Sequence, residues 1–313
     1  MCQVFILGAM LLFGFMSALS QTIDALTKPV DKSPHTSGFI TANGIRLHYL
    51  DWGGKGNVLL LLTGFGDEAH VFDEFAPKFT DRFHVIGLTR RGFGESDKPR
   101  AGYEPETRVE DIRQFLDALK IQQVSLIGHS MAGDELTLFA TLYPQRVRKL
   151  VYLDAAINRY GLLEILLTDP GITPGQKKLR LEVTGTPAAL QEAAKIVVTN
   201  LPPPDVWEIY KAYAKAMWMF RPDYTKVKDP ALAFYALSEH HPDITPETDE
   251  AKRRQLDDWL VKKLLLFIRR SIEQFRREAP RGHIIEMKNA THYVFVGETS
   301  EQVIRQTREF LLQ

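Results

Sequence analysis

The sequence predicts an α/β fold: a doubly wound, mostly parallel sheet of eight strands with an inserted helical cap. Short apolar runs recur along the chain, and stretches with helical periodicity separate them, which is the pattern of parallel strands covered by helices on both faces. This alternation stops between residues 156 and 228, where only helical periodicity is found. The chain has 313 residues, 44% of them hydrophobic, which suffices for one full core.

The first elements predict an antiparallel start to the sheet. Residues 39–50 are expected to form two short strands around Asn43 and Gly44, because this dipeptide tolerates the positive φ of a tight hairpin turn. Residues 58–62 are apolar throughout, as expected of a strand that is buried on both faces. The same pattern returns at residues 84–88, 124–127 and 150–153.

Helical periodicity is clearest at residues 105–120, where Val109, Ile112 and Phe115 share one stripe. Beyond the cap the sequence predicts, in order, a strand at 232–237, a long amphipathic helical segment at 246–278, a last strand at 283–287 and a closing helix at 300–312. The core is therefore expected to comprise residues 21–155 and 229–313, and the cap residues 156–228.

The amino-terminal segment is typical of a signal peptide. Residues 4–18 are apolar and uncharged but shorter than the roughly 20 residues that span a bilayer. Ala18 and Ser20 are the small residues that signal peptidase reads before a cut at Gln21. We expect a secreted or periplasmic protein with residues 1–20 removed; because no Lys or Arg precedes the apolar run, an uncleaved membrane anchor is the alternative. Cys2 is the single cysteine, so the mature chain would form no disulfide.

Charge and composition narrow the classes of partner. Lys plus Arg and Asp plus Glu both number 39, so no net field favours nucleic acid. The histidines are scattered, and the glycines at 92 and 94 lack the strand-to-helix context of a dinucleotide site. We therefore expect a small-molecule substrate and neither a metal nor an organic cofactor. The oligomeric state is not predicted.

The segment 124–133 contains the strongest chemical signal, Gly128-His129-Ser130-Met131-Ala132. A serine nucleophile needs a sharp turn between strand and helix, with small residues two positions before and two after it. Gly128 and Ala132 meet this requirement. The alternative is an ordinary serine that caps a helix after a strand. Ser130 is predicted to be a nucleophile.

Four motifs in order resemble those of the α/β-hydrolase superfamily, from about Thr36 to the end of the chain. They are an oxyanion loop at 63–67, the loop at 90–99 after the fourth strand, the elbow at 128–133 and a histidine loop at 289–293. Within the superfamily, the chain resembles the serine esterase-like branch with a helical cap. Two residues depart from the family pattern: Thr63 replaces a histidine and Thr89 replaces an aspartate.

The resemblance implies roles for individual residues. His292 would be the general base, since it follows the final strand on the histidine loop. The backbone N–H groups of Phe65 and Met131 would form the oxyanion hole.

The acid that orients the histidine is less well defined. In most of the superfamily it follows the seventh strand, where this chain has Glu239; in a minority branch that includes some haloalkane dehalogenases it follows the sixth, where this chain has Asp154. Asp154 is favoured over Glu239, and Asp243 is a third candidate. Asp154 could instead be the N-cap that opens the cap region.

These roles predict hydrolysis of a carboxylic ester through an acyl-enzyme. The cap is rich in large apolar residues, which either line a pocket for an apolar substrate group or pack the cap against the core: Trp207, Tyr210, Tyr213, Met217, Trp218, Met219 and Phe220. A serine at position 130 argues against the epoxide-hydrolase and dehalogenase branches, which have an aspartate there. The alternatives are cleavage of a C–C bond or a lactone by the same residues, and a receptor that turns over its ligand once or not at all.

Overall fold

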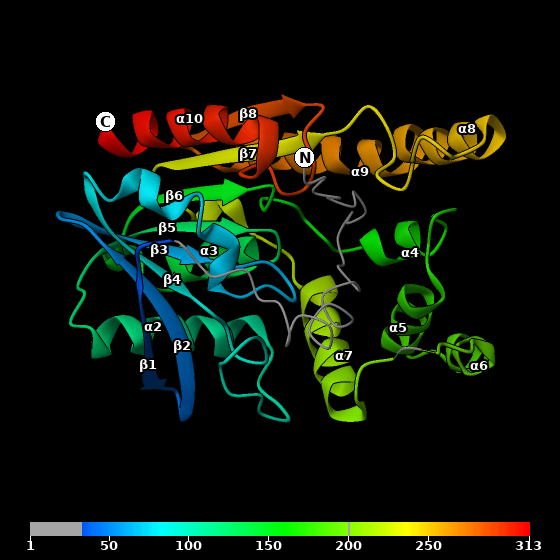
Figure 1. Cartoon of the computed structure of the whole chain (residues 1–313), viewed down its shortest axis with the longest axis horizontal. Coiled ribbons are helices and arrows are strands. Elements are labelled where there is room, and N and C mark those ends of the chain that lie inside the picture. Colours follow the sequence, from blue (N-terminus) through cyan, green and yellow to red (C-terminus); the bar gives the residue numbers. More distant parts are fainter. Residues whose placement is uncertain (1–32, 200) are drawn as a thin grey trace, which may run out of the picture.

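The structure, a computed structural model, describes residues 33–199 and 201–313. The predicted signal peptide and Cys2 lie outside the described residues. One eight-stranded sheet forms the centre, with the strand order β1-β2-β4-β3-β5-β6-β7-β8 (Figure 1). The predicted fold class is confirmed.

The sheet begins with a hairpin and continues with parallel strands. Asn43 and Gly44 connect its two strands with φ of 49° and 74°, the positive values that the hairpin turn requires. β1 pairs with β2 and β2 with β4 in antiparallel fashion, and all later pairs are parallel. The strands are β1 (Thr36–Ala42), β2 (Ile45–Gly53), β3 (Asn57–Leu62), β4 (Phe83–Leu88), β5 (Val124–His129), β6 (Val147–Leu153), β7 (Ala231–Leu237) and β8 (Gly282–Lys288).

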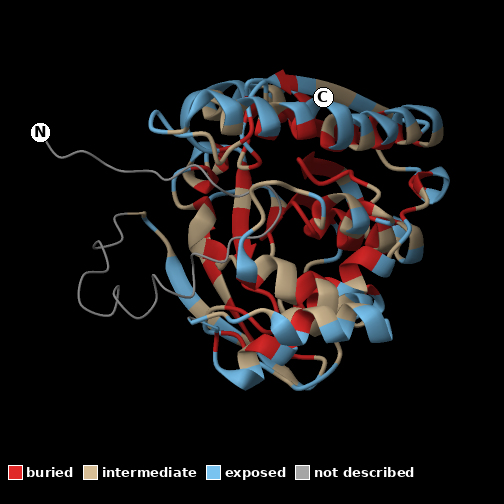
Figure 2. Ribbon diagram, turned by 90° about the vertical axis from the view of Figure 1, so that its right-hand side faces the viewer, coloured by how far each residue is buried: buried red, intermediate tan, exposed pale blue. Residues whose placement is uncertain are grey.

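The central strands read as continuous apolar runs because both of their faces are buried. Leu60 packs in one hydrophobic cluster, whereas its neighbours Leu59 and Leu61 pack in a second cluster across the sheet. Figure 2 shows buried residues along the central strands and exposed residues on the outward sides of the helices.

Two layers of helices supply the partners of these faces. The first cluster includes side chains from α2 (Pro105–Ala118), α3 (Ala132–Leu142) and α9 (Leu265–Glu278). The second includes side chains from α10 (Ser300–Leu312) and from the 3-10 turns at Ala69–Phe72 and Ala76–Phe79. The long amphipathic segment contains α8 (Glu250–Trp259), a π-helical turn at Leu260–Leu264 and α9.

The cap is helical in the part of it that the structure describes. α4 (Leu162–Leu166), α5 (Pro174–Thr184), α6 (Pro187–Lys195) and α7 (Pro204–Met219) all lie between β6 and β7 in the sequence. In Figure 1 they extend beyond the end of β6. Because the parallel strands end at one edge of the sheet, the cap faces the loops that carry the predicted site residues.

The start of α3 packs closely against the chain that leaves β6. A Cβ added to Gly133 would lie 1.9 Å from the backbone oxygen of Ala155, and one added to Gly128 would lie 2.7 Å from Leu136 Cδ1 and 2.9 Å from Ala132 Cβ. The small residues around Ser130 are thus required by packing on both sides of the turn.

This contact predicts a large loss of stability for Gly133→Ala. A backbone oxygen cannot rotate away from the new methyl group, so we expect the free energy of unfolding to fall by about 3 kcal/mol or more, as measured by urea denaturation. Gly161→Ala is the control: its Cβ would meet nothing within 4 Å, and its φ of 83° should cost only about 1–2 kcal/mol. A wild-type unfolding midpoint for Gly133→Ala would contradict this packing.

Candidate active site

Ser130 lies in a strained turn between β5 and α3. Its φ is 56°, a left-handed value that residues other than glycine rarely adopt. Two hydrogen bonds hold it: its N–H donates to the Leu153 carbonyl at 3.2 Å, and its carbonyl accepts from the Gly133 N–H at 3.1 Å. The side chain is buried at 6% exposure. Such strain persists where surrounding structure enforces it, and it is concentrated at functional sites.

His292 and Asp154 form a buried pair beside this turn. Nδ1 of His292 lies 2.6 Å from Oδ2 of Asp154. Since a carboxylate oxygen accepts hydrogen bonds, Nδ1–H is the donor in this contact, and in the neutral ring this leaves Nε2 able to accept a proton. The other oxygen, Oδ1, accepts from the Ala236 N–H at 2.9 Å, and the Asp154 N–H donates to the Phe234 carbonyl at 3.0 Å. The adjacent strand β7 thereby fixes the carboxylate.

The other two candidate acids lie elsewhere. Glu239 follows β7 and is exposed. Asp243 faces a different histidine, with its Oδ2 3.8 Å from Nδ1 of His241. Of the three acids considered from the sequence, the structure brings Asp154 to His292.

His129 connects the elbow to the histidine loop. Its Nε2 lies 3.2 Å from the His292 carbonyl oxygen, to which it donates, and the two rings lie 4.6 Å apart between centroids. Burial lowers the pKa of His129, so the ring stays neutral. Because Ser130 is the next residue, this contact places the turn against the loop that carries His292.

A second contact connects the histidine loop to the predicted oxyanion loop. The Tyr293 hydroxyl donates to Asp67 Oδ1 at 3.1 Å. Burial, assisted by the nearby Asp67 carboxylate, raises the pKa of Tyr293, so the hydroxyl keeps its proton. The loops after β3, β5 and β8 are therefore joined at one edge of the sheet.

The two predicted oxyanion donors come from the loops after β3 and β5. Met131 is the N-cap of α3, so its N–H belongs to the group that a helix leaves without an intrahelical acceptor. Phe65 follows Gly64 in the loop after β3, and its ring lies against the cap. The centroid of this ring is 5.2 Å from that of Tyr210 and 6.0 Å from that of Tyr213.

The large apolar residues of α7 have different environments. Tyr213 is fully buried and its hydroxyl donates to the Arg91 carbonyl at 2.6 Å, which is packing of the cap against the core. Met219, in contrast, is 65% exposed. Among the apolar cap residues noted in the sequence, the rings of Tyr210 and Tyr213 contact Phe65 of the predicted oxyanion loop.

A buried cluster of charged side chains beneath these loops was not predicted from the sequence. Nη1 of Arg90 lies 2.9 and 2.7 Å from the two carboxylate oxygens of Glu135, which also pairs with Arg108 at 2.9 Å. Next to Glu135, Asp134 lies 2.9 Å from Nη1 of Arg159, and burial raises the pKa of Asp134 to about 6. The available signal was two adjacent acids in the first turn of an otherwise apolar helix, 132–142.

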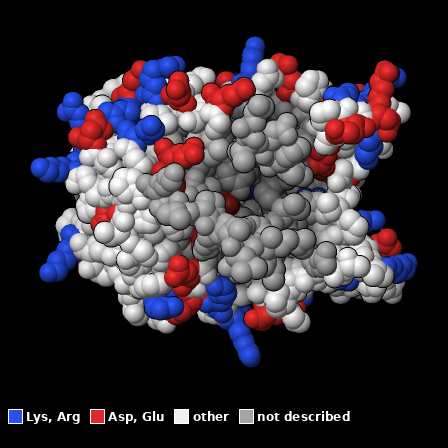
Figure 3. All heavy atoms as spheres, in the orientation of Figure 1, with Lys and Arg blue, Asp and Glu red and all other residues white. Residues whose placement is uncertain are grey.

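Residues 33–199 and 201–313 contain no group of three His, Cys, Asp or Glu side chains that could hold a metal ion. Within the same ranges, none of the helices is both long and apolar enough to cross a membrane. On the face in Figure 3, charges of both signs are interspersed around the rim.

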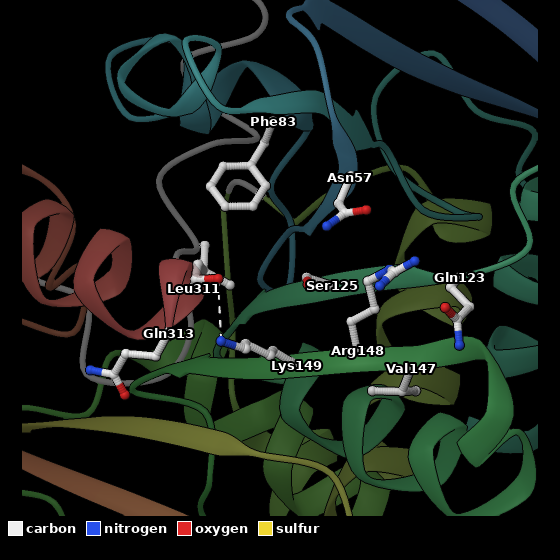
Figure 4. Close-up of a pocket in the computed structure, with 9 residues that line it drawn as sticks. All are labelled: Asn57, Phe83, Gln123, Ser125, Val147, Arg148, Lys149, Leu311 and Gln313. Atoms are coloured by element: carbon white, nitrogen blue, oxygen red, sulfur yellow. Dashed lines mark hydrogen bonds between the residues drawn. The ribbon is translucent and has the colours of Figure 1, made fainter.

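A cavity of about 420 Å³ lies away from Ser130. Its lining comes from the amino ends of the parallel strands and the end of α10: Asn57, Phe83, Gln123, Ser125, Val147, Arg148, Lys149, Leu311 and Gln313. The Lys149 ammonium, drawn in Figure 4, already donates to the carbonyls of Phe310 at 2.7 Å and Leu311 at 3.2 Å. This cavity is at the opposite edge of the sheet from the site.

Comparison with known proteins agrees with the fold. The family model described as the alpha/beta hydrolase fold matches residues 57–188. An uncharacterised protein of Mycobacterium tuberculosis is 36% identical over 129 residues, which cover 41% of this chain and 38% of that protein. Epoxide hydrolase 4 of Mus musculus is 33% identical over 118 residues, which cover 37% of this chain and 33% of the relative.

These matches thus span less than two fifths of either curated relative. A solved structure of a bacterial membrane phospholipase A superposes with a TM-score of 0.60 at 22% identity, covering 94% of this chain and 91% of that one. The matched family model, the strand order and the strained turn after β5 all agree with the α/β-hydrolase fold for this chain.

Proposed function

We propose that this protein is a serine hydrolase that cleaves a carboxylic ester with an apolar group through an acyl-enzyme. The observation that carries the proposal is the buried hydrogen bond of 2.6 Å between His292 and Asp154, next to a serine with a φ of 56°. A serine hydroxyl is a weak nucleophile unless an oriented base removes its proton. The pair supplies such a base, and the strained turn presents the hydroxyl.

The mechanism follows from these positions. Ser130 Oγ attacks the ester carbonyl while Nε2 of His292 takes its proton. The N–H groups of Phe65 and Met131 bind the oxyanion that forms, and Asp154 stabilises the imidazolium through Nδ1–H. His292 then gives the proton to the departing alkoxide. The same histidine activates a water molecule, which attacks the acyl-enzyme and releases the acid and free Ser130.

The residue at the elbow argues for an acyl substrate even though the mouse relative is named an epoxide hydrolase. If Ser130 opened an epoxide, the product on the enzyme would be an ether, which water activated by a histidine does not cleave. If Ser130 attacks an acyl carbon, the product is an ester, which the same water hydrolyses. If free Ser130 is to be regenerated after each turnover, the substrate must therefore supply an acyl group.

The environment of the oxyanion loop supports an apolar substrate group. The ring of Phe65 contacts Tyr210 of the cap at 5.2 Å and Phe93 at 5.4 Å between centroids. Apolar and aromatic walls with a few polar groups are typical of small-molecule sites. We expect an acyl or alkoxy group of small to medium size to lie against these rings.

Time courses with p-nitrophenyl acetate and butyrate test this function. Steady release of many equivalents of p-nitrophenol per enzyme is expected, and faster turnover of butyrate would support the apolar contact. A single burst equal to the enzyme concentration, or no release, would favour the receptor alternative. Two further substrates test the alternative activities: a lactone tests lactone hydrolysis, and a vinylogous 1,5-diketone tests cleavage of a C–C bond. A higher kcat/KM for either than for the esters would overturn the ester assignment.

A further inference from the structure

Arg90 contacts both segments that carry the predicted oxyanion donors. It follows β4 and is 3% exposed. On one side, Nη2 donates to the carbonyl oxygens of Thr63 and Gly64, the latter at 3.0 Å. On the other side, Nη1 binds both carboxylate oxygens of Glu135, at 2.9 and 2.7 Å. One planar guanidinium therefore bridges the loop after β3 and the first turn of α3.

The bond to Gly64 acts directly on one donor. The Gly64 carbonyl and the Phe65 N–H belong to the same peptide group, which is trans, so the two point in opposite directions. A cation on the carbonyl oxygen fixes the plane of this peptide and aims the N–H away from Arg90. It also draws electron density toward the oxygen, which makes the N–H a stronger hydrogen-bond donor.

The bond to Glu135 acts on the helix that carries the other donor. Met131 is the N-cap of α3, and Glu135 lies four residues later, so both are in the first turn of the helix. Glu135 is fully buried, and its carboxylate is held by Arg90 together with Arg108. The Arg90–Glu135 pair thus connects the loop that carries Phe65 to the helix that carries Met131.

We propose that Arg90 is a positioning residue that sets the direction, spacing and strength of the oxyanion donors Phe65 and Met131. This inference rests on the proposed ester hydrolysis. The donors meet a full negative charge only in the tetrahedral transition state, so the loss of Arg90 should affect the chemical step and leave substrate binding nearly unchanged. A merely structural role, in which Arg90 only neutralises buried Glu135, would instead lower stability.

Arg90→Lys tests the proposal, because lysine keeps the charge but lacks the planar fork that reaches two carbonyls and a carboxylate. We expect kcat to fall about 100-fold, similar to the loss of one oxyanion donor, with KM near that of the wild type. The affinity for an alkyl boronic acid, which forms a tetrahedral anion on the serine, should fall in proportion to kcat. The melting temperature is measured for every variant.

Arg108→Lys is the matched control. Arg108 is buried and also binds Glu135, but no hydrogen bond to the loop after β3 is found for it among the described residues. This variant should lose comparable stability and keep kcat. Equal losses of kcat in the two variants, a change confined to KM, or unchanged boronate affinity in Arg90→Lys would overturn the proposal.

Two further results distinguish a variant that fails to fold from a failure of the proposed ester hydrolysis itself. If Arg90→Lys does not fold, Glu135→Gln replaces it: kcat and boronate affinity should then fall together, and unchanged values would overturn the proposal. If the wild type itself neither turns over esters nor binds the boronate, the proposed function has failed, and the assignment of Arg90 fails with it.

Discussion

Ser130→Ala is expected to lower kcat for p-nitrophenyl butyrate by about 10⁵-fold or more and to leave the fold intact. Without the hydroxyl no acyl-enzyme forms, and what remains is the contribution of the oxyanion donors and of binding. Steady-state assays at saturating substrate, together with circular dichroism, measure both parts of this expectation.

The chain offers a matched control for this substitution. Ser125 lies on the same strand, is also buried, and lines the cavity at the opposite edge of the sheet. Ser125→Ala should therefore keep kcat close to that of the wild type. If Ser130→Ala retained a tenth of the activity or more, the proposed covalent route would be wrong.

The second large effect is expected for Asp154→Asn, a fall in kcat of about 10⁴-fold. If the amide oxygen of the asparagine accepts from the Ala236 N–H, as Oδ1 of Asp154 does at 2.9 Å, the NH₂ group must face His292. It would then donate to Nδ1 and force the ring proton onto Nε2. In that tautomer the histidine cannot take the proton of Ser130, although every heavy atom keeps its place.

Glu239→Gln is the counterpart to this variant. Because Glu239 is exposed, its replacement should leave kcat close to that of the wild type. The comparison uses kcat at saturating p-nitrophenyl butyrate for both variants. Mild and equal losses would contradict the assignment of either residue as the acid, and a severe loss in Glu239→Gln alone would exchange their roles.

The parts of the fold that could be predicted are those that depend on residues close together in the sequence. The buried strands read as apolar runs, and Asn43 with Gly44 defined the hairpin, since both properties depend on neighbours in the chain. The strand order, with β4 between β2 and β3, depends on pairing between distant segments and was not predicted. The packing of the cap helices could not be predicted from the sequence for the same reason.

The candidate site likewise has features that depend on neighbouring residues and features that depend on contacts between distant segments. The elbow could be recognised because Gly128, Ser130 and Ala132 are close in sequence. The sequence favoured Asp154 as the acid but did not exclude Glu239, since both residues follow strands. It depends on a contact between residues 138 positions apart and on the backbone of β7, which holds Asp154. The Arg90–Glu135 pair spans 45 positions and has no local pattern.

The central proposal is that Ser130 is the nucleophile, and labelling with a fluorophosphonate tests it most directly. The reagent phosphonylates an activated serine, and mass spectrometry of the digested protein locates the adduct. We expect one equivalent of label per chain, on the peptide that contains Ser130, and no label in Ser130→Ala. An absent adduct in the wild type, or an adduct on another serine, would contradict the assignment.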